Sequence, residues 1–273
     1  MGIRITAEVI TIATGIVCIY SGSLRHLKDW KKLWINMNNL DVYLFNVYET
    51  RSKWIYRIQI TATAIFIGLN WLYFAYDTVS ENKSILIDIL YPTIEFLKFI
   101  WLLIFYNFIS CLQARFQTFH KLMERDSLNT LGLIDCKSIE TIYLHLVESF
   151  RIVNRIFGIP IFMITTSTMV LFLFVISIVL QGLKGNIFSI LFAMLNLIAS
   201  ANIQLSVVII ACAAATMEMN KSSYVICKLM VKLQSKGVHM DVIKELYPVL
   251  NASRTNFRFT AAGFFVVGNS LIF

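Results

Sequence analysis

The stretch Ile159–Leu183, IPIFMITTSTMVLFLFVISIVLQGL, carries no charge in 25 residues. After three residues it is followed by Ile187–Met217, IFSILFAMLNLIASANIQLSVVIIACAAATM, which carries none in 31. A helix needs about 20 apolar residues to cross the hydrocarbon core of a bilayer. Barrel strands are shorter and alternate in polarity, whereas a helix satisfies its own backbone hydrogen bonds in lipid. Both stretches therefore predict membrane-spanning α-helices.

The composition of the chain agrees with a lipid environment. Hydrophobic residues make up 58% of the 273 residues and charged residues 15%, and the mean hydropathy is +0.70. Soluble domains have about half apolar and roughly a quarter charged residues. Only three prolines occur, and no linker or internal repeat separates the sequence into parts. We expect an all-α polytopic membrane helical bundle, formed by one integral membrane domain over residues 1–273.

Uncharged length gives about six spans in all. The fourth and fifth are the two stretches quoted above, and the third is interrupted near its start by Glu95 and Lys98. The last, Phe259–Phe273, would reach only about 22 Å as a helix against a core of about 30 Å, so we expect it to be incomplete. The six predicted spans lie near residues 5–24, 56–77, 86–112, 159–183, 187–214 and 259–273.

Lysines and arginines orient these spans, because they concentrate in cytosolic connections. The connections 25–57, 113–158 and 218–258 hold seven, six and seven of them, whereas 77–84 and 184–186 hold one each. The three basic connections are therefore predicted to be cytosolic, which accounts for the net charge of +8 without nucleic-acid binding. The sequon Asn82-Lys-Ser84 then lies outside, and Asn82 is a candidate glycosylation site.

The cytosolic connections show helical periodicity. We expect their apolar faces to be buried either within the chain or against another subunit, and we expect the first helix to end near Gly158, with Pro160 in the first turn of the next span. The apolar positions recur at three-and-four spacing: Ile139, Ile142, Tyr143, Leu146, Phe150, Val153 and Phe157, then Tyr224, Cys227, Met230 and Leu233, then Val242, Ile243, Leu246 and Leu250.

No pattern of residues predicts an enzyme, a metal site or a cofactor. The four histidines, His26, His120, His145 and His239, have no metal-ligand spacing and are interpreted as surface or packing residues. Asp29, Asp41 and Glu49 accompany basic residues on what we interpret as a solvated face. Phosphate loops, nucleophile elbows and zinc-protease motifs are absent from the sequence.

The final stretch carries a resemblance to a known family. Phe259, Ala261, Gly263 and Phe265 form a Phe-x-Ala-x-Gly-x-Phe pattern that resembles the start of the last membrane segment in insect gustatory receptors. The Thr-Tyr…Gln-Phe signature that follows in that family lies beyond Phe273. The order of spans and the long basic connections are similar over nearly the whole chain.

The resemblance implies seven helices, a cytosolic N-terminus and tetramers, homomeric or with other gustatory receptor subunits, that act as ligand-gated cation channels. Cytosolic helix extensions would form the central anchor and the last helix would line the pore, which gives the Phe259 pattern the role of a pore-helix motif. The chain is then expected to lack the family's first span and the outer part of its last, and not to conduct by itself. The expected localisation is the plasma membrane of sensory neurons.

The resemblance also implies a ligand cavity among the outer halves of the spans, suited to a small-molecule tastant. Glu95 and Lys98, three residues apart, are expected to pair or to lie at the interface with an aromatic belt. The candidate ligand-binding residues are Asn70, Trp71, Tyr73, Tyr76, Tyr91, Glu95 and Lys98.

Three alternatives remain open. An odorant receptor of the same superfamily differs only through the tail pattern. A G-protein-coupled receptor lacks support, because the sequence has neither Asp-Arg-Tyr nor Asn-Pro-x-x-Tyr and no cysteine in an outside connection. A secondary transporter would favour repeated halves and broken spans.

Overall fold

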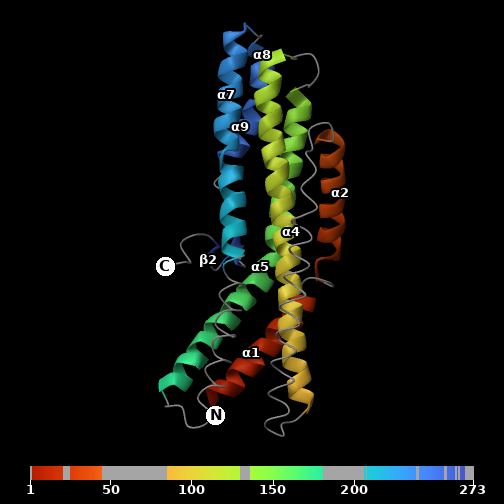
Figure 1. Cartoon of the computed structure of the whole chain (residues 1–273). Helices are drawn as coiled ribbons and strands as arrows, with labels where there is room; N and C mark the ends of the chain where they lie inside the picture. The colour runs from red at the N-terminus through yellow and green to blue at the C-terminus, as the bar shows by residue number, and fades with distance from the viewer. Residues whose placement is uncertain are drawn as a thin grey trace. The chain divides into compact units, whose positions relative to one another are not determined.

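The described part of the chain is almost entirely helical (Figure 1). The computed structural model describes residues 2–20, 25–44, 85–129, 136–180, 208–237, 240–254, 257–261 and 265–267, together with positions 206 and 263. The predicted all-α class is confirmed. The elements are α1 (Gly2–Ile19), α2 (Leu27–Leu44), α4 (Ile85–Asn129), α5 (Cys136–Leu180), α7 (Ser222–Ser235), α8 (Met240–Lys244), α9 (Tyr247–Ser253), β1 (Thr260–Ala261) and β2 (Phe265–Val266).

The chain forms two compact units. Unit 1 comprises residues 1–25, 49–104 and 159–207, and unit 2 comprises residues 26–48, 105–158 and 208–273. Unit 1 therefore takes in α1 and most of the predicted spans, whereas unit 2 takes in most of each of the three basic connections. Connections on the same side of a bilayer can meet in this way. Their assignment to the cytosol stays a prediction.

Apolar length singles out two of the described helices. Phe96–Glu124 within α4 and Lys137–Val170 within α5 are long and apolar enough to cross a membrane, and Val9–Cys18 within α1 is a shorter apolar segment. The predicted spans at 86–112 and 159–183 fall largely on α4 and α5. The span at 56–77 lies outside the described residues, and of the span at 187–214 only position 206 and residues 208–214 lie within them.

Unit 1 places polar side chains inside and large apolar ones outside. Thr14, Lys98 and Ser167 are at most 2% exposed, whereas Ile16 and Leu173 are 61% and 62% exposed. Buried hydroxyls of Thr14, Thr165 and Thr168 donate to carbonyls one helical turn earlier, as Thr14 does to Ile10 at 2.7 Å. Water would favour the opposite arrangement, so the outer surface of unit 1 is suited to lipid.

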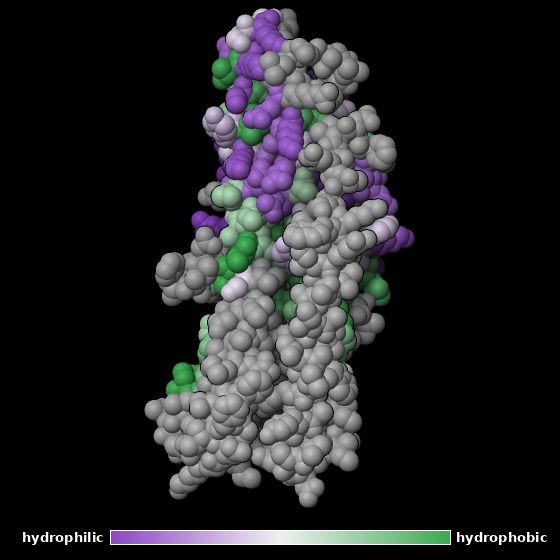
Figure 2. Space-filling view, viewed as in Figure 1, coloured by the Kyte–Doolittle hydropathy of each residue, from purple (hydrophilic) through white to green (hydrophobic). Residues whose placement is uncertain are grey.

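Unit 2 is built around aromatic side chains. Phe116, Phe119, Tyr143 and Phe259 are among its largest fully buried residues. The Phe150 and Phe259 rings meet edge to face with centroids 4.5 Å apart. The predicted apolar face Ile139–Phe157 of α5 is confirmed, since its seven residues are all buried. Figure 2 shows hydrophilic side chains gathered on this unit around α7.

Helix α2 is tied to its neighbours by carboxylates. Asp41 receives two bonds from the Arg115 guanidinium of α4, at 3.0 and 2.8 Å, and Asp29 receives one from Arg155 of α5 at 3.2 Å. Asp29 and Asp41 thus pair with arginines of the bundle. The predicted solvated face is wrong for Asp29, whose side chain is 19% exposed, and holds in part for Asp41, whose side chain is 46% exposed. Sequence reasoning missed these pairs because their partners lie 74 and 126 residues away.

Helix α5 does not end near Gly158, contrary to prediction. It continues from Cys136 to Leu180 with Pro160 inside it. A proline removes one backbone N–H, here the donor that would bond the carbonyl of Ile156. Leaving the helix in lipid would expose several such groups instead of one, so continuing is the less costly choice.

The face of α7 that is buried differs from the predicted one. Tyr224 is 68% exposed and Cys227 is exposed, whereas Val225, Ile226 and Leu229 are buried. Apolar residues occur on both faces of α7 at helical spacing, so periodicity could not select between them. Leu233 is buried as predicted, and so are Ile243, Leu246 and Leu250; the side chain of Val242 lies outside the described residues.

The stretch predicted as a pore helix begins as a β-hairpin. Thr260 pairs with Val266 and Ala261 with Phe265 in an antiparallel ladder, and Gly263 in the turn has a φ of 84°. Glycine adopts this conformation readily, and the phenylalanine and valine around it favour extended backbone. The Asn154 side chain of α5 holds β1 by accepting a bond from the Thr260 N–H at 2.9 Å. The helical prediction is therefore wrong for the described residues Thr260, Ala261, Phe265 and Val266.

Candidate functional site

Lys98 forms a buried polar centre in unit 1. It lies on α4, is 2% exposed, and its Nζ donates to the Ser167 Oγ of α5 at 2.9 Å. A buried ammonium is costly in an apolar helical bundle and is a marker of a functional position. The Lys98 side chain is directed inward to α5, and its depth relative to the outer interface stays a prediction.

Helix α1 completes the surroundings of Lys98. Its Cys18 side chain is fully buried. One turn earlier, the Thr14 hydroxyl lies 3.5 Å from the Met163 carbonyl of α5. Gly15 of α1 faces Ile94 of α4 so closely that a Cβ would be 2.8 Å from its Cγ2. Three helices therefore pack together near Lys98, and α1 and α4 approach closely at Gly15.

The other predicted ligand-binding residues are not brought to this centre by anything that the structure describes. Tyr91 and Glu95 lie on α4, but their side chains are outside the described set, so the Glu95–Lys98 pair stays a prediction. The remaining candidates lie outside the described residues, as does the glycosylation candidate Asn82: Asn70, Trp71, Tyr73 and Tyr76.

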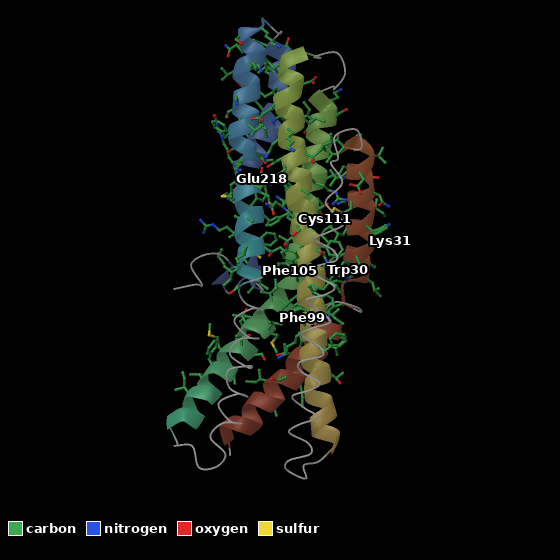
Figure 3. All side chains as sticks on the ribbon, in the orientation of Figure 1. Trp30, Lys31, Phe99, Phe105, Cys111 and Glu218 are labelled. Carbon is green, nitrogen blue, oxygen red and sulfur yellow. The ribbon has the colours of Figure 1, made fainter. Side chains whose placement is uncertain are left out.

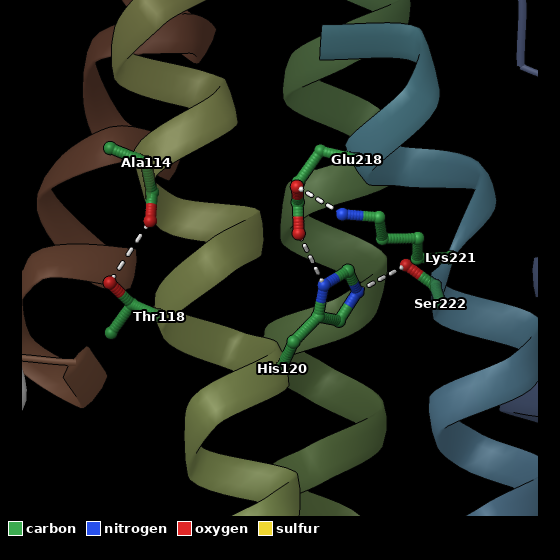
Figure 4. Close-up of polar contacts among 6 residues, drawn as sticks. All are labelled: Ala114, Thr118, His120, Glu218, Lys221 and Ser222. Atoms are coloured by element: carbon green, nitrogen blue, oxygen red, sulfur yellow. Dashed lines mark hydrogen bonds and ion pairs between the residues drawn. The ribbon is translucent and has the colours of Figure 1, made fainter. Parts of the chain in front are cut away.

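Unit 2 contains a second polar centre that sequence reasoning missed. His120 of α4 lies between Glu218 Oε1, 3.0 Å from its Nδ1, and Ser222 Oγ, 2.9 Å from its Nε2 (Figure 4). Lys221 Nζ donates to the other Glu218 oxygen at 3.1 Å. The rings of Phe116 and Phe119 flank the imidazole, with centroids 6.4 and 5.9 Å away. Both imidazole nitrogens and both carboxylate oxygens thus have partners.

Glu218 is held in its ionised form. Burial would raise the pKa of its carboxyl group, but the hydrogen bonds from His120 and Lys221 and their charges outweigh burial and lower the pKa overall. The carboxylate therefore accepts from Nδ1 of His120, which places the ring proton there in the neutral tautomer and leaves Nε2 to accept from the Ser222 hydroxyl.

The order serine–histidine–carboxylate resembles the nucleophile and base of hydrolases. The arrangement differs from a hydrolase site in its access to substrate, because Ser222 is 0% and His120 6% exposed. A nucleophile must reach its substrate, and this hydroxyl is enclosed by the bundle. The arrangement can hold helices together, and it supports no acyl transfer.

The second centre lies at an interruption of the helical chain. The Lys221 N–H bonds back only three residues, to Glu218 at 3.2 Å, and α7 starts at Ser222. Glu218 is thus before the interruption and Ser222 after it, and His120 binds both. We call His120, Glu218, Lys221 and Ser222 the α4–α7 joint. A sequence signal existed only in the spacing of Glu218, Lys221 and Ser222 on one helical face, because His120 lies 98 residues from Glu218.

The comparisons with known proteins agree with this membrane architecture. No curated protein matches the chain. A family model described as 7tm Chemosensory receptor matches residues 4–273, nearly its whole length. The match confirms the polytopic membrane bundle and a chemoreceptor role, and it concerns a family of receptors and not of enzymes. With apolar helices whose interior holds polar side chains, and with a family match from Arg4 to Phe273, the chain belongs to the 7tm chemosensory receptor family.

Proposed function

We propose that this chemosensory receptor is a gustatory receptor subunit that detects a small organic molecule and gates a cation channel. The observation that carries the proposal is Lys98, an amine buried where three helices of unit 1 meet. The Phe-x-Ala-x-Gly-x-Phe pattern favours a gustatory over an odorant receptor. The proposed assembly is a tetramer, homomeric or mixed, in the plasma membrane of sensory neurons, with the basic connections in the cytosol.

The proposed ligand contacts Lys98 and the side chains predicted around it. A buried ammonium donates hydrogen bonds and favours ligands with acceptor oxygens, and the predicted aromatic residues would cover their apolar parts. These residues are Asn70, Trp71, Tyr73, Tyr76, Tyr91 and Glu95. Ligand that displaces Ser167 from Lys98 would change how α4 packs against α5.

Helix α4 is the proposed element through which ligand binding at Lys98 affects the α4–α7 joint. Lys98 and His120 lie on this one continuous helix, which runs from Ile85 to Asn129. A rotation or shift of α4 that follows ligand binding would act on the α4–α7 joint. The equilibrium between two arrangements of the joint is the proposed gating element, and the ligand would shift it only by binding one arrangement better.

The proposal is tested by ligand-evoked current. The full-length receptor is expressed in cells and exposed to a panel of sugars, amino acids, carboxylic acids and alkaloids, and currents are recorded for wild type and Lys98→Met. Methionine keeps the length of the side chain and removes its charge. We expect the half-maximal concentration of an active ligand to rise at least about tenfold, equivalent to the loss of one charged hydrogen bond.

Lys137→Met is the matched control, because Lys137 is exposed at the start of α5. Its half-maximal concentration should stay within about twofold of wild type. Tyr73→Ala and Glu95→Gln test the predicted remainder of the site. Unchanged responses in Lys98→Met with normal surface expression would refute this ligand site. Responses that need a G protein and carry no cation current would refute the channel.

A further inference from the structure

Helix α2 presents a second face that its own bundle does not use. Leu33, Met37 and Leu40 pack inward, and Trp30 contacts the rings of Phe108 and Phe157 with centroids 5.2 and 5.7 Å away. Figure 3 shows Trp30 directed toward α4 and Lys31 directed away from it. The outward residues of the first half of α2 are exposed and form what we call the basic-aromatic face: Leu27, Lys28, Lys31, Trp34 and Ile35.

The charge of this face is positive, and none of the described carboxylates pairs with its two lysines. The carboxylates of α2, Asp29 and Asp41, pair with Arg155 and Arg115. Lys28 and Lys31 form no ion pair with any residue in the part of the chain that the structure describes. The helix therefore buries or pairs its negative charges and turns its free positive ones outward.

The exposed apolar side chains of this face indicate a location at the interface between water and lipid. Trp34 is 66% exposed and Leu27 61%, although they lie beside two exposed lysines. Tryptophan next to lysine on one helical face is typical of segments at the headgroup level, where the indole and the ammonium both find partners. The outward residues of the second half, Asn38, Asn39 and Val42, carry no charge.

The position of α2 in the sequence, and its contacts with α4, also agree with a location at the level of the lipid headgroups. It begins eight residues after the end of α1, the first apolar segment of the chain. Trp30 contacts Phe108, close to the end of the predicted span 86–112, whereas Asp41 bonds Arg115 further along α4. The exposed lysines and asparagines of α2 could not lie in hydrocarbon, so the part of α4 beside them lies at or beyond the membrane surface.

We propose that the basic-aromatic face of α2 binds the anionic phospholipid headgroups of the adjacent leaflet. The ammonium groups of Lys28 and Lys31 contact headgroup phosphates and carboxylates, and Trp34 and Leu27 lie at the boundary with the acyl chains. This site is separate from the ligand centre at Lys98 and does not depend on the proposed channel. Its consequence is that lipid composition sets how firmly α2 is held at the membrane.

The test measures lipid binding to the purified full chain. Native mass spectrometry in a neutral detergent gives dissociation constants for phosphatidylserine and phosphatidylcholine of equal acyl length. Removal of one lysine near an anionic surface weakens binding about fivefold, so Lys28→Gln/Lys31→Gln should weaken phosphatidylserine binding about 25-fold and leave phosphatidylcholine unchanged. Raising the salt concentration should weaken wild-type binding of phosphatidylserine and have little effect on the variant.

The matched control is Lys137→Gln/Lys236→Gln, which removes the same charge from two exposed positions of unit 2. Its phosphatidylserine binding should stay within about twofold of wild type. Equal losses in the two variants would overturn the proposal in favour of a general charge effect, and no loss in either would overturn it outright. A variant that lowers the oligomeric state with unchanged lipid binding would instead identify the face as a contact between copies. Equal helical circular dichroism in all variants shows that the fold is kept.

Discussion

The α4–α7 joint makes a quantitative prediction about coupling between His120 and Glu218. His120→Ala removes a bond to an ionised carboxylate, worth roughly 1.5–3 kcal/mol, and leaves the buried Ser222 hydroxyl without its partner, at a cost of roughly 1–3 kcal/mol. We expect a loss of about 3–5 kcal/mol in the free energy of unfolding. Glu218→Ala should cost about 2–4 kcal/mol, since it also removes the Lys221 bond, but Lys221 is 52% exposed and regains water.

The double variant tests whether the bond between His120 and Glu218 contributes to the free energy of unfolding. His120→Ala/Glu218→Ala should cost about 1.5–3 kcal/mol less than the sum of the single variants, because the shared bond is lost only once. The assay is urea unfolding of the purified chain in detergent, followed by labelling of the buried thiols of Cys18 and Cys212 in a background without the other cysteines. Losses that add to within about 0.5 kcal/mol would refute the joint as a coupled unit.

Three further predictions concern other contacts and use the same unfolding assay. Gly15→Ala should lower the free energy of unfolding by about 1–3 kcal/mol, because the new Cβ would lie 2.8 Å from Ile94 Cγ2. Adding Ile94→Ala to this variant should restore part of the loss. A neutral Gly15→Ala would contradict the close approach of α1 and α4. Asp41→Asn should cost about 1–2 kcal/mol, because Arg115 is 7% exposed and loses two charged bonds, although Asp41 is itself 46% exposed. Asp29→Asn should cost less than about 1 kcal/mol, because its one bond comes from Arg155, which is 59% exposed. The reverse order would show that burial of the arginine does not decide these pairs. The pKa of Glu218 is lower in the folded than in the unfolded chain, so its ionised form stabilises the folded state above the ordinary glutamate pKa of about 4.3. This stabilisation is lost as the pH falls from there through the lowered pKa, so the difference in unfolding free energy between wild type and Glu218→Gln should shrink below about pH 4.3. A constant difference down to about pH 3 would contradict the prediction.

Local patterns in the sequence predicted the helical class and one buried face. The Ile139–Phe157 face of α5 is confirmed because its apolar stripe is continuous, whereas Glu148, Arg151 and Arg155 occupy the opposite side of the helix. Helix α7 had apolar residues on both sides, and the choice between them depended on neighbours that periodicity does not contain. The hairpin at Gly263 was missed because its stabilising partner, Asn154, comes from another helix.

The polar centres were accessible to sequence reasoning to different degrees. Lys98 was a candidate from the start, because a charge inside an apolar stretch is visible by itself. Its inward direction depended on Ser167, 69 residues away, and could not be anticipated. His120 looked like a surface or packing residue, since its meaning lies in Glu218 and Ser222, which only the folded chain brings to it.

The central claim is that a membrane chemoreceptor gathers its three basic connections into one cytosolic unit. Cys227 of α7 tests it most directly, because its thiol is exposed, unlike those of Cys18 and Cys212. With Cys111 and Cys136 replaced by serine, a membrane-impermeant maleimide is applied to cells that express the full-length receptor, before and after permeabilisation. Labelling only after permeabilisation is the predicted result. Labelling of intact cells to the same extent would place unit 2 outside and contradict the account.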